Sequence, residues 1–398
     1  MPEPRVIFVN RVYWPSETAT AQLLTDLAES LVARGWPVHV ITAGSGAGER
    51  NGVIIHCVGA VQPPGGLLVR ARHHREFARC ARAQLSTLVQ PGDIVVLKTD
   101  PPLLAAACTA LAQSRGARVV QWIQDIYPEI VPAHFGAWIA PLFWLQKWRR
   151  NRAWHAADLC LPVGADMRKM VLAQGTRADQ VVVMPNWAPR ELDTPANPAE
   201  VDALRRAWGL AEKFVVAYSG NLGRVHEFDT VLGTAKMLRA HPEIVVFFIG
   251  DGPRLAEVQA DAERRQLTNI RFLPPQPRAK LAASLAVADV QLVTLRPGFE
   301  RLVNPSKLAG ILAAGRPAIY VGAPGGEISE LLEREKCGFS APAGNPLELY
   351  GAIRGIRFQP EQAATFGRNA RACYTRHFSL GAATARWDEL LRKLIVRR

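Results

Sequence analysis

The chain has 398 residues and a net charge of +13, with 48% hydrophobic and 21% charged residues. These proportions are typical of a globular protein with a large core, in two or three domains, and exclude a disordered chain, a coiled coil and a collagen repeat. The positive charge is spread along the chain: residues up to Arg190 include 20 Lys and Arg and 13 Asp and Glu, and the residues after it include 28 and 22. This favours a phosphate-binding cleft over a nucleic-acid arm, with a generally Arg-rich surface as the alternative.

Six cysteines are scattered along the chain, and none forms a C-x-x-C pair or a metal-ligand cluster with histidine. We expect reduced thiols in a cytoplasmic protein. Residues Met1–Arg5 lead directly into an apolar run, without a signal-peptide pattern. The longest apolar stretch, Leu103–Ala112, is shorter than the roughly 20 residues that a membrane span needs.

The first half of the chain alternates short apolar runs with segments of helical periodicity. This alternation predicts a parallel sheet covered by helices. The expected strands are Val6–Val9, Val38–Thr42, Ile94–Leu97, Val119–Ile123, Leu159–Val163 and Val181–Met184, and the expected helices are Ala21–Arg34, Leu103–Arg115 and Asp166–Gln174.

The segment Pro185–Pro198 has four prolines and little periodicity, so it is expected to link two domains. The alternation then restarts, which predicts a second α/β domain. Its expected strands are Phe214–Ser219, Ile244–Ile249, Ile270–Leu273, Val290–Leu295 and Ala318–Val321, and its helices are Phe228–Leu238, one from Arg254, Lys307–Ala314 and Leu380–Val396.

Ligands of such sheets bind at the carboxyl ends of the strands, so we examined the loops there. The loop Asn10–Thr20 precedes a helix N-terminus that suits an anion, or Ser16 or Thr18 merely caps that helix. Gly220 and Gly223 follow the strand Phe214–Ser219 and permit close approach to a ligand.

Arg224, in the same loop, can pair with phosphate. A second tight turn, Gly250–Pro253, follows the next strand.

The segment Val303–Pro317 is the strongest local signal. Asn304 or Ser306 is expected to cap a short helix with Lys307 in its first turn. A lysine there opposes the helix dipole unless an anion is bound, and the alternative is a solvated surface lysine.

At this point the sequence resembles the retaining GT-B glycosyltransferases of family 4, in particular those of bacterial surface-polysaccharide, O-antigen and lipopolysaccharide biosynthesis. The resemblance lies in YWPSETATAQLLTDLAESLVARG, QDIYPE, YSGNLGRVHEFDT, FFIGDGPR and NPSKLAGILAAGRP. It implies an α/β fold of two Rossmann-like domains facing each other across a cleft: residues 1–190 for the acceptor and 191–398 for the nucleotide-sugar. The terminal helix, about 380–396, is expected to pack back on the first domain.

The resemblance also implies transfer of a hexosyl or N-acetylhexosaminyl group from a donor that we expect to be a UDP-sugar, without a metal or other cofactor. The implied acceptor is linked to polyprenyl diphosphate, at the cytoplasmic face of the inner membrane, and no nucleic acid is involved. Expected catalytic residues are Asp125, Arg224, Lys307 and Glu300. Expected donor-binding residues are Ser16, Glu17, Thr18, Gly220, Asn221, Gly223, His226, Asp251, Gly252, Gln276, Asn304, Ser306 and Leu308.

Two departures from the family pattern stand out. Asn221 and His226 occupy the places of an Arg and a Lys that hold the donor diphosphate in many relatives, so Arg224 is the candidate substitute, and His226 adds charge only when protonated. Leu302 and Gly310 replace a pair of glutamates, which leaves Glu300 as the nearest carboxylate for donor-sugar hydroxyls.

Asp125 follows the strand Val119–Ile123 and is a candidate to orient or deprotonate an acceptor hydroxyl, or it caps a turn before Pro128. Glu129 is a weaker candidate.

Two segments combine basic and aromatic residues. Leu68–Arg82 is predicted to be a basic helix, and the segment from Trp138 interleaves tryptophans with Lys and Arg. Such a composition suits a membrane interface, unless the tryptophans pack against the sheet. The expected membrane or acceptor residues are Arg72, Arg75, Trp144, Trp148, Arg149 and Arg150.

Two other functions fit the same two-domain architecture. A nucleotide-sugar 2-epimerase would leave the aromatic and basic segment unexplained, and a catalytically silent GT-B binding module would fit the missing Arg/Lys and Glu pairs.

Overall fold

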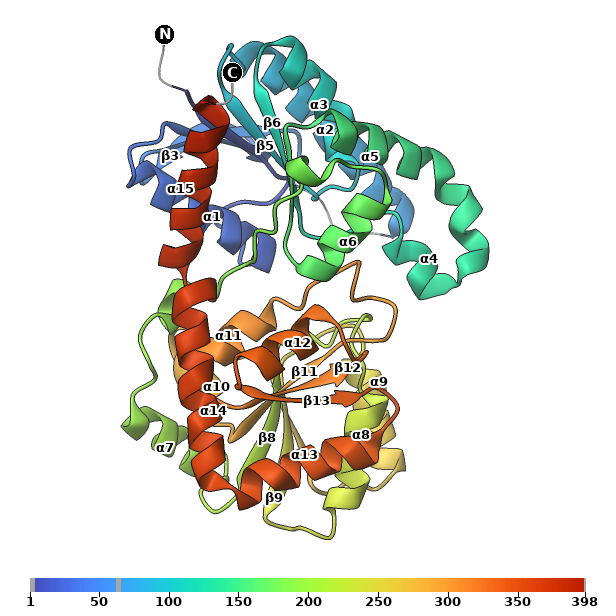
Figure 1. Cartoon of the computed structure of the whole chain (residues 1–398), viewed down its shortest axis with the longest axis vertical. Coiled ribbons are helices and arrows are strands. Elements are labelled where there is room, and N and C mark those ends of the chain that lie inside the picture. The colour runs from blue at the N-terminus through green and yellow to red at the C-terminus, as the bar shows by residue number, and fades with distance from the viewer. Residues whose placement is uncertain (1–3, 62–65, 397–398) are drawn as a thin grey trace. The chain divides into compact units, whose positions relative to one another are not determined.

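The computed structural model describes residues 4–61 and 66–396 (Figure 1). These residues form two compact units. Unit 1 comprises the residues up to Pro185, Arg301–Asn304 and those from Ala383 onward, and unit 2 comprises Asn186–Glu300 and Pro305–Ala382. Residues 1–3, which belong to the segment without a signal-peptide pattern, lie outside the described residues.

Unit 1 contains a seven-stranded sheet in the order β3-β4-β2-β1-β5-β6-β7. All neighbours are parallel except the antiparallel pair β3–β4. The central strands are buried on both faces, as continuous apolar runs predict. The strands are β1 (Val6–Val9), β2 (Val38–Ala43), β3 (Ala47–Arg50), β4 (Val53–Val58), β5 (Ile94–Lys98), β6 (Arg118–Ile123) and β7 (Leu159–Pro162).

Helices cover the sheet of unit 1, and α3 packs against both α2 and α5 (Figure 1). The helices are α1 (Ala19–Val32), α2 (Leu67–Leu88), α3 (Leu104–Ser114), α4 (Ile130–Phe135), α5 (Trp144–Ala156) and α6 (Ala165–Ala173), with a 3-10 helix at Ala137–Phe143. Among the described residues, no helix is both long and apolar enough to cross a bilayer.

The C-terminal helix α15 (Leu380–Val396) has the bounds that the sequence predicts. Its residues from Ala383 onward belong to unit 1. There Trp387 is fully buried and packs edge-on against Trp122 of β6 and Phe8 of β1, with ring centroids 5.0 and 6.3 Å apart. The last helix of the chain therefore completes the core of unit 1.

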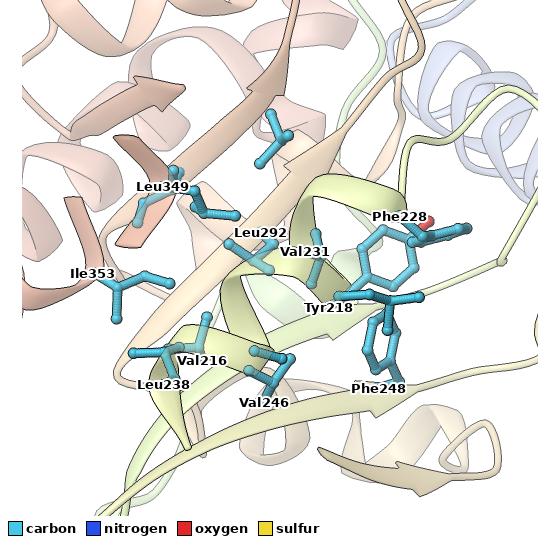
Figure 2. Packing of buried hydrophobic residues seen from close by; sticks show 14 of the residues in the cluster. Val216, Tyr218, Phe228, Val231, Leu238, Val246, Phe248, Leu292, Leu349 and Ile353 are labelled. Carbon is cyan, nitrogen blue, oxygen red and sulfur yellow. The ribbon is translucent and has the colours of Figure 1, made fainter. Parts of the chain in front are cut away.

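Unit 2 contains a six-stranded parallel sheet in the order β10-β9-β8-β11-β12-β13. Its core on one face gathers Val216, Tyr218, Phe228, Phe248 and Leu292 (Figure 2). The strands are β8 (Phe214–Ser219), β9 (Ile244–Ile249), β10 (Ile270–Leu273), β11 (Val290–Thr294), β12 (Ala318–Gly322) and β13 (Gly338–Pro342).

The helices of unit 2 include the short α11, which begins at Lys307. They are α7 (Pro198–Ala207), α8 (Asp229–Leu238), α9 (Leu255–Arg264), α10 (Leu281–Ala286), α11 (Lys307–Ala313), α12 (Glu327–Arg334), α13 (Pro346–Phe358) and α14 (Pro360–Cys373).

The predicted α/β class, with two parallel-sheet units, is confirmed. Strands β8, β9 and β10 have their predicted bounds. The strand expected at Val181–Met184 is wrong, because only an isolated bridge joins Val181 to Cys160. Sequence reasoning also missed β3, β4 and β13. The edge strands β3 and β13 are short and lack a long apolar run, whereas β4 is a largely apolar run that was overlooked.

Candidate functional site

Two glycine loops pack tightly together at the carboxyl ends of β8 and β9. A Cβ atom on Gly250 would lie 2.0 Å from the carbonyl oxygen of Gly220, and one on Gly252 would lie 2.5 Å from Asn221 Oδ1. Leu222 N also donates a hydrogen bond to Asp251 O over 2.8 Å. Gly250 and Gly252 thus serve the close approach of one loop to the other.

The ammonium group of Lys307 lies beside these loops. Its Nζ is 3.4 Å from the ring centroid of Tyr218, and a Cβ on Gly220 would lie 3.8 Å from it. Lys307 Nζ is buried and has no hydrogen-bond partner among the described residues. Burial holds the pKa of Lys307 well below its usual value. The solvated surface lysine considered from the sequence is therefore wrong, and a buried amine without a partner among the described residues is available to take up a proton and pair with an anion.

His226 lies under the same loop as a neutral, structural side chain. Its Nδ1 donates to Thr294 O over 2.6 Å, and its ring packs against Tyr218 and Phe228. Burial, reinforced by the neighbouring Lys307, lowers the pKa of His226 to about 3. The expected contribution of a protonated His226 is therefore corrected: the imidazole carries no charge at neutral pH.

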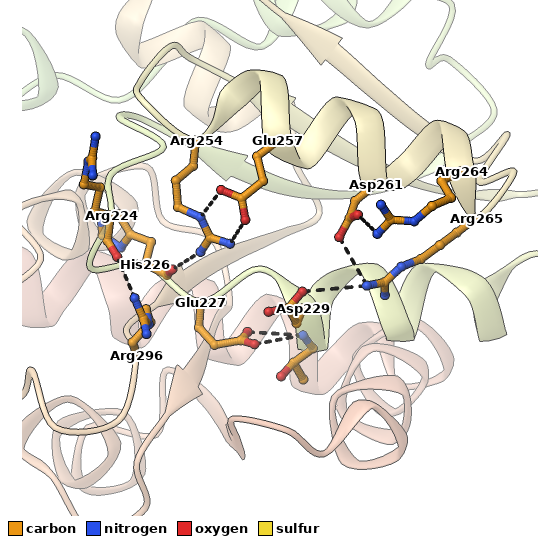
Figure 3. A network of polar contacts seen from close by, with 11 residues as sticks. Arg224, His226, Glu227, Asp229, Arg254, Glu257, Asp261, Arg264, Arg265 and Arg296 are labelled. Atoms are coloured by element: carbon orange, nitrogen blue, oxygen red, sulfur yellow. Dashed lines mark hydrogen bonds and ion pairs between the residues drawn. The ribbon is translucent and has the colours of Figure 1, made fainter. Parts of the chain in front are cut away.

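Arginines brace the loop from outside, as Figure 3 shows. Arg254 donates to His226 O over 2.8 Å and pairs with Glu257 at 2.7 Å. Arg296 donates to the carbonyl oxygen of Arg224 over 3.4 Å. Arg224 itself is exposed. It lies in the same loop as Asn221 and Gly223, the other donor-binding candidates there.

Several expected phosphate contacts are already engaged within the protein. Gly220 N donates to Ile249 O over 2.8 Å, so this amide is not free. Ser306 is exposed and, although it occupies the N-cap of α11, its side chain makes no capping hydrogen bond. The Leu308 side chain is buried in the core, and its amide donates to Pro305 O. The predicted capping is therefore wrong, whereas the donor contact of Leu308 stays a prediction.

Three further candidates lie in loops of unit 2. Asp251 is exposed, and its Oδ1 accepts from Gly252 N at 2.7 Å. Gln276 follows β10, and its side chain donates to Pro274 O. Glu300 Oε2 accepts from Gly298 N at 2.8 Å. Glu300 Oε1 is buried without a hydrogen-bond partner in the described part of the chain, so it remains available to accept from a sugar hydroxyl.

Asp125 follows β6 at the carboxyl edge of the unit 1 sheet. Its backbone forms an antiparallel bridge with Val303, and Ile126 N donates to Leu302 O over 2.8 Å. The residue itself is exposed. Loss of hydration among the surrounding protein atoms and the nearby Asp100 carboxylate raise the pKa of Asp125 to about 6. A carboxyl group with this pKa is suited to exchange a proton near neutral pH.

Sequence reasoning missed the charged residues at the end of β5. Lys98 is buried, and burial lowers its pKa to about 7. Asp100 accepts two hydrogen bonds from Arg11, at 2.9 and 3.1 Å. These residues stand in the sequence Lys-Thr-Asp directly after an apolar run, a polar strand end of the kind that pointed to Asp125.

The other candidates from the first loop also lie in unit 1. Ser16 Oγ is 3.1 Å from Thr18 Oγ1, and Glu17 is exposed. Thr18 occupies the N-cap of α1 but makes no capping hydrogen bond, so the capping alternative is wrong. Asn304 donates to Val163 O over 3.4 Å within unit 1 and is thus placed in the other unit from Lys307.

Exposed aromatic residues gather in the region of α4, the following 3-10 helix and α5, residues 135–148, which we call the aromatic segment. Trp138, Leu142 and Trp144 are 79%, 72% and 67% exposed. The other large exposed apolar residues there are Phe135, Leu145 and Trp148. Arg149 and, on α2, Arg72 and Arg75 are exposed as well.

Arg150 is not a surface cation. It is buried, pairs with both Glu129 oxygens at 2.7 and 2.9 Å, and stacks on the buried Trp154 at 3.9 Å. The expectation of a membrane or acceptor contact is therefore wrong for Arg150. The alternative, packing against the protein, holds for Trp154 and not for Trp144 and Trp148.

All six cysteines are free thiols. In the described ranges, no group of three or more His, Cys, Asp or Glu side chains is arranged to hold a metal ion.

The comparisons with known proteins agree with this architecture. Residues 20–191 match the family model of Glycosyltransferase Family 4, and residues 200–372 match Glycosyl transferases group 1. The fold and these matches define a GT-B glycosyltransferase. The N-terminal region is thus similar to Glycosyltransferase Family 4 and the C-terminal region to Glycosyl transferases group 1.

Similar proteins include two bacterial relatives and one solved structure. "Probable glycosyltransferase WbjE" of Pseudomonas aeruginosa is 27% identical over 69% of this chain and 68% of its own. "Putative colanic acid biosynthesis glycosyl transferase WcaI" of Escherichia coli is 28% identical over 81% of this chain and 84% of its own. HepE of Anabaena, crystallised in complex with UDP, is 16% identical with a TM-score of 0.76, over 98% of this chain and 100% of its own.

Proposed function

We propose that the protein is a retaining glycosyltransferase that transfers a hexosyl or N-acetylhexosaminyl group from a UDP-sugar. Its proposed acceptor is a polyprenyl-diphosphate-linked precursor of a surface polysaccharide such as an O-antigen. The names of WbjE and WcaI and the UDP bound to HepE support this assignment. The observation that carries it is the buried amino group of Lys307, which has no hydrogen-bond partner among the described residues and lies beside the glycine loops.

The proposed role of Lys307 follows from the charge that the reaction develops. The bond between the sugar C1 and the phosphate oxygen breaks, and UDP leaves with the electron pair. Lys307, with Arg224 from the exposed loop, stabilises the negative charge that grows on the diphosphate, and such stabilisation favours the transition state. Glu300 Oε1 accepts a hydrogen bond from a hydroxyl of the donor sugar.

Asp125 is the proposed base for the acceptor. The acceptor oxygen forms the new bond to C1, and its proton passes to the Asp125 carboxylate. The pKa of about 6 leaves this carboxylate ionised at neutral pH and basic enough to accept a proton.

Nucleotide binding tests the donor assignment. UDP, GDP, ADP and TDP are compared by thermal shift, each with Mg²⁺ and with EDTA. We expect UDP to raise the melting temperature most, equally in both conditions, because protein cations bind its phosphates. Lys307→Met should weaken UDP binding roughly 10- to 100-fold, since a hydrogen bond to a charged group contributes about 1.5–3 kcal/mol.

The matched control is Lys236→Met, which removes an exposed lysine of α8 from the same unit. Equal UDP affinity in wild type and Lys307→Met would reject the donor site. Transfer of labelled sugar from the UDP-sugar to lipid of a membrane extract then separates a transferase from an epimerase, which alters the donor alone, and from a silent module, which turns nothing over.

We also propose that the aromatic segment binds the cytoplasmic face of a membrane. Exposed tryptophans suit the headgroup region, and Arg149 supplies positive charge for anionic lipid. In flotation with vesicles of phosphatidylglycerol and phosphatidylethanolamine, Trp144→Ser with Trp148→Ser should remove most of the binding. Phe358→Ser, which removes an exposed aromatic residue of unit 2, should bind like wild type. Unchanged binding of the double variant would reject this surface.

A further inference from the structure

Lys98 ends β5 with its side chain buried in unit 1 rather than exposed to solvent. Lys98 pairs in register with Trp122 of the neighbouring strand β6. Its Nζ lies 4.0 Å from the Trp122 ring centroid and donates a hydrogen bond to Thr20 O over 2.9 Å. Both interactions favour the charged form of the amine.

The aromatic ring that Lys98 contacts belongs to a tightly packed cluster. Trp122 packs against Trp387 of α15, which in turn packs against Phe8 of β1. All three rings are fully buried. The ammonium of Lys98 is thus held in one place by packed aromatic rings, so its charge acts on its surroundings from a fixed position.

Asp100 and Asp125 follow the ends of the two paired strands β5 and β6, close in the chain to Lys98 and to its partner Trp122. The negative charges of Asp100 and Asp125 both raise the pKa of Lys98. In turn, Asp100 raises the pKa of Asp125, whereas Lys98 lowers it. Arg11, after β1, is engaged by both carboxylate oxygens of Asp100. His74 of α2 faces Arg11 and Asp100, and burial lowers its pKa.

We infer that Lys98 is a positioning residue that keeps the Asp125 carboxylate charged and ready to accept a proton, while Asp100 opposes it. This inference rests on the role proposed for Asp125. Lys98 itself touches neither substrate and transfers no proton in the reaction. Its ammonium stabilises the ionised form of Asp125, and the aromatic rings fix the position from which it does so.

Direct titration of Asp125 tests this inference without an activity assay. The full-length protein is labelled with ¹³C at the aspartate carboxyl carbons, and the Asp125 resonance is identified by its loss in Asp125→Asn. Removing a positive charge should raise the midpoint of this titration, and removing a negative charge should lower it. We expect Lys98→Met to shift it up by about one pH unit and Asp100→Asn to shift it down by about one unit.

Opposite shifts distinguish the inference from a general loss of stability. Lys98→Arg should keep the wild-type midpoint, because it retains the positive charge. Gln121→Met serves as the packing control. Gln121 lies next to Trp122 on β6 and donates a buried hydrogen bond to Thr109 of α3, so its loss should leave the Asp125 midpoint unchanged. If Lys98→Met fails to fold, Lys98→Gln, which also removes the positive charge, takes its place and should raise the midpoint in the same way. If the midpoint of the Asp125 titration is the same in the wild type and in all variants, the inference is overturned.

The acid limb of the pH profile of kcat/KM for transfer to membrane lipid should shift up in Lys98→Met and down in Asp100→Asn, as the titration midpoint does. If Asp125→Asn retains full transfer, the proposed role of Asp125 fails whatever the titration shows. If Asp125→Asn is inactive but the midpoints do not shift, Lys98 alone loses its role.

Discussion

Each unit places a buried lysine over an aromatic ring near the carboxyl ends of its strands. Lys98 lies 4.0 Å from the ring of Trp122, and Lys307 lies 3.4 Å from that of Tyr218. Lys98 donates to Thr20 O and has carboxylates nearby, whereas Lys307 has no hydrogen-bond partner among the described residues.

This difference in partners indicates a different role for each lysine. A buried charge is costly unless a partner compensates it. The protein itself compensates Lys98, which therefore acts on its own carboxylates. Lys307 lacks this compensation, so a bound anion supplies it in our account.

The largest expected effect separates the two units. Asp125→Asn should reduce transfer by roughly 10²- to 10⁴-fold, the range that a general base contributes. UDP binding, measured by calorimetry, should remain at the wild-type level because Asp125 belongs to unit 1. Equal loss of transfer and UDP binding would contradict the division of roles between the units.

The next effect concerns the glycine loops beside Lys307. Gly250→Ala should destabilise the protein by roughly 1–3 kcal/mol or more, because its φ is +151° and its Cβ would lie 2.0 Å from Gly220 O. Gly351→Ala, in helix α13 with open space around it, should instead stabilise by roughly 0.5–1 kcal/mol. Urea unfolding of both variants measures the contrast, and equal stability would show that the close packing of the loops is not required.

A smaller effect separates the ring of Tyr218 from its hydroxyl. The hydroxyl donates to Asn221 O over 2.7 Å, so Tyr218→Phe should cost about 1 kcal/mol of unfolding free energy. UDP affinity should stay close to wild type because the ring under Lys307 remains, whereas Tyr218→Leu should lower it. If Tyr218→Phe weakened UDP binding as much as Tyr218→Leu, the ring would have no separate role.

The smallest effect is expected at His226. Because its pKa is about 3, the imidazole should not titrate between pH 5 and 8. Its ring-proton chemical shifts, identified by comparison with His226→Gln, should stay constant over that range. A midpoint near 6.5 would restore His226 as a candidate for pH-dependent phosphate binding.

The sequence predicts the central strands well and the charged groups around them less well. Phe214–Ser219 and Ile244–Ile249 are continuous apolar runs, because both faces of these parallel strands are buried. Lys98 was missed because it stands within β5 itself, and the groups that make its burial tolerable, the Trp122 ring and Thr20 O, come from other elements of the fold.

The aromatic segment shows why an interleaved pattern misleads. Arg150 and Trp154 are four residues apart on one face of α5, and that face packs into unit 1. Trp144 and Trp148 share another face, which is exposed. Counting basic and aromatic residues in the sequence cannot tell these faces apart. The folded structure does, because it shows Arg150 paired with Glu129.

Proton uptake on UDP binding tests most directly the claim that Lys307 awaits an anion. Burial holds its pKa well below the usual value, and a bound diphosphate favours the charged form, so binding should take up a proton at Lys307. Calorimetry at one pH near 7.5 in two buffers of different ionisation enthalpy measures this uptake. We predict uptake in the wild type, loss of it in Lys307→Met, and weaker UDP binding as the pH rises. Binding without proton uptake in the wild type, or equal uptake in both proteins, would contradict the account.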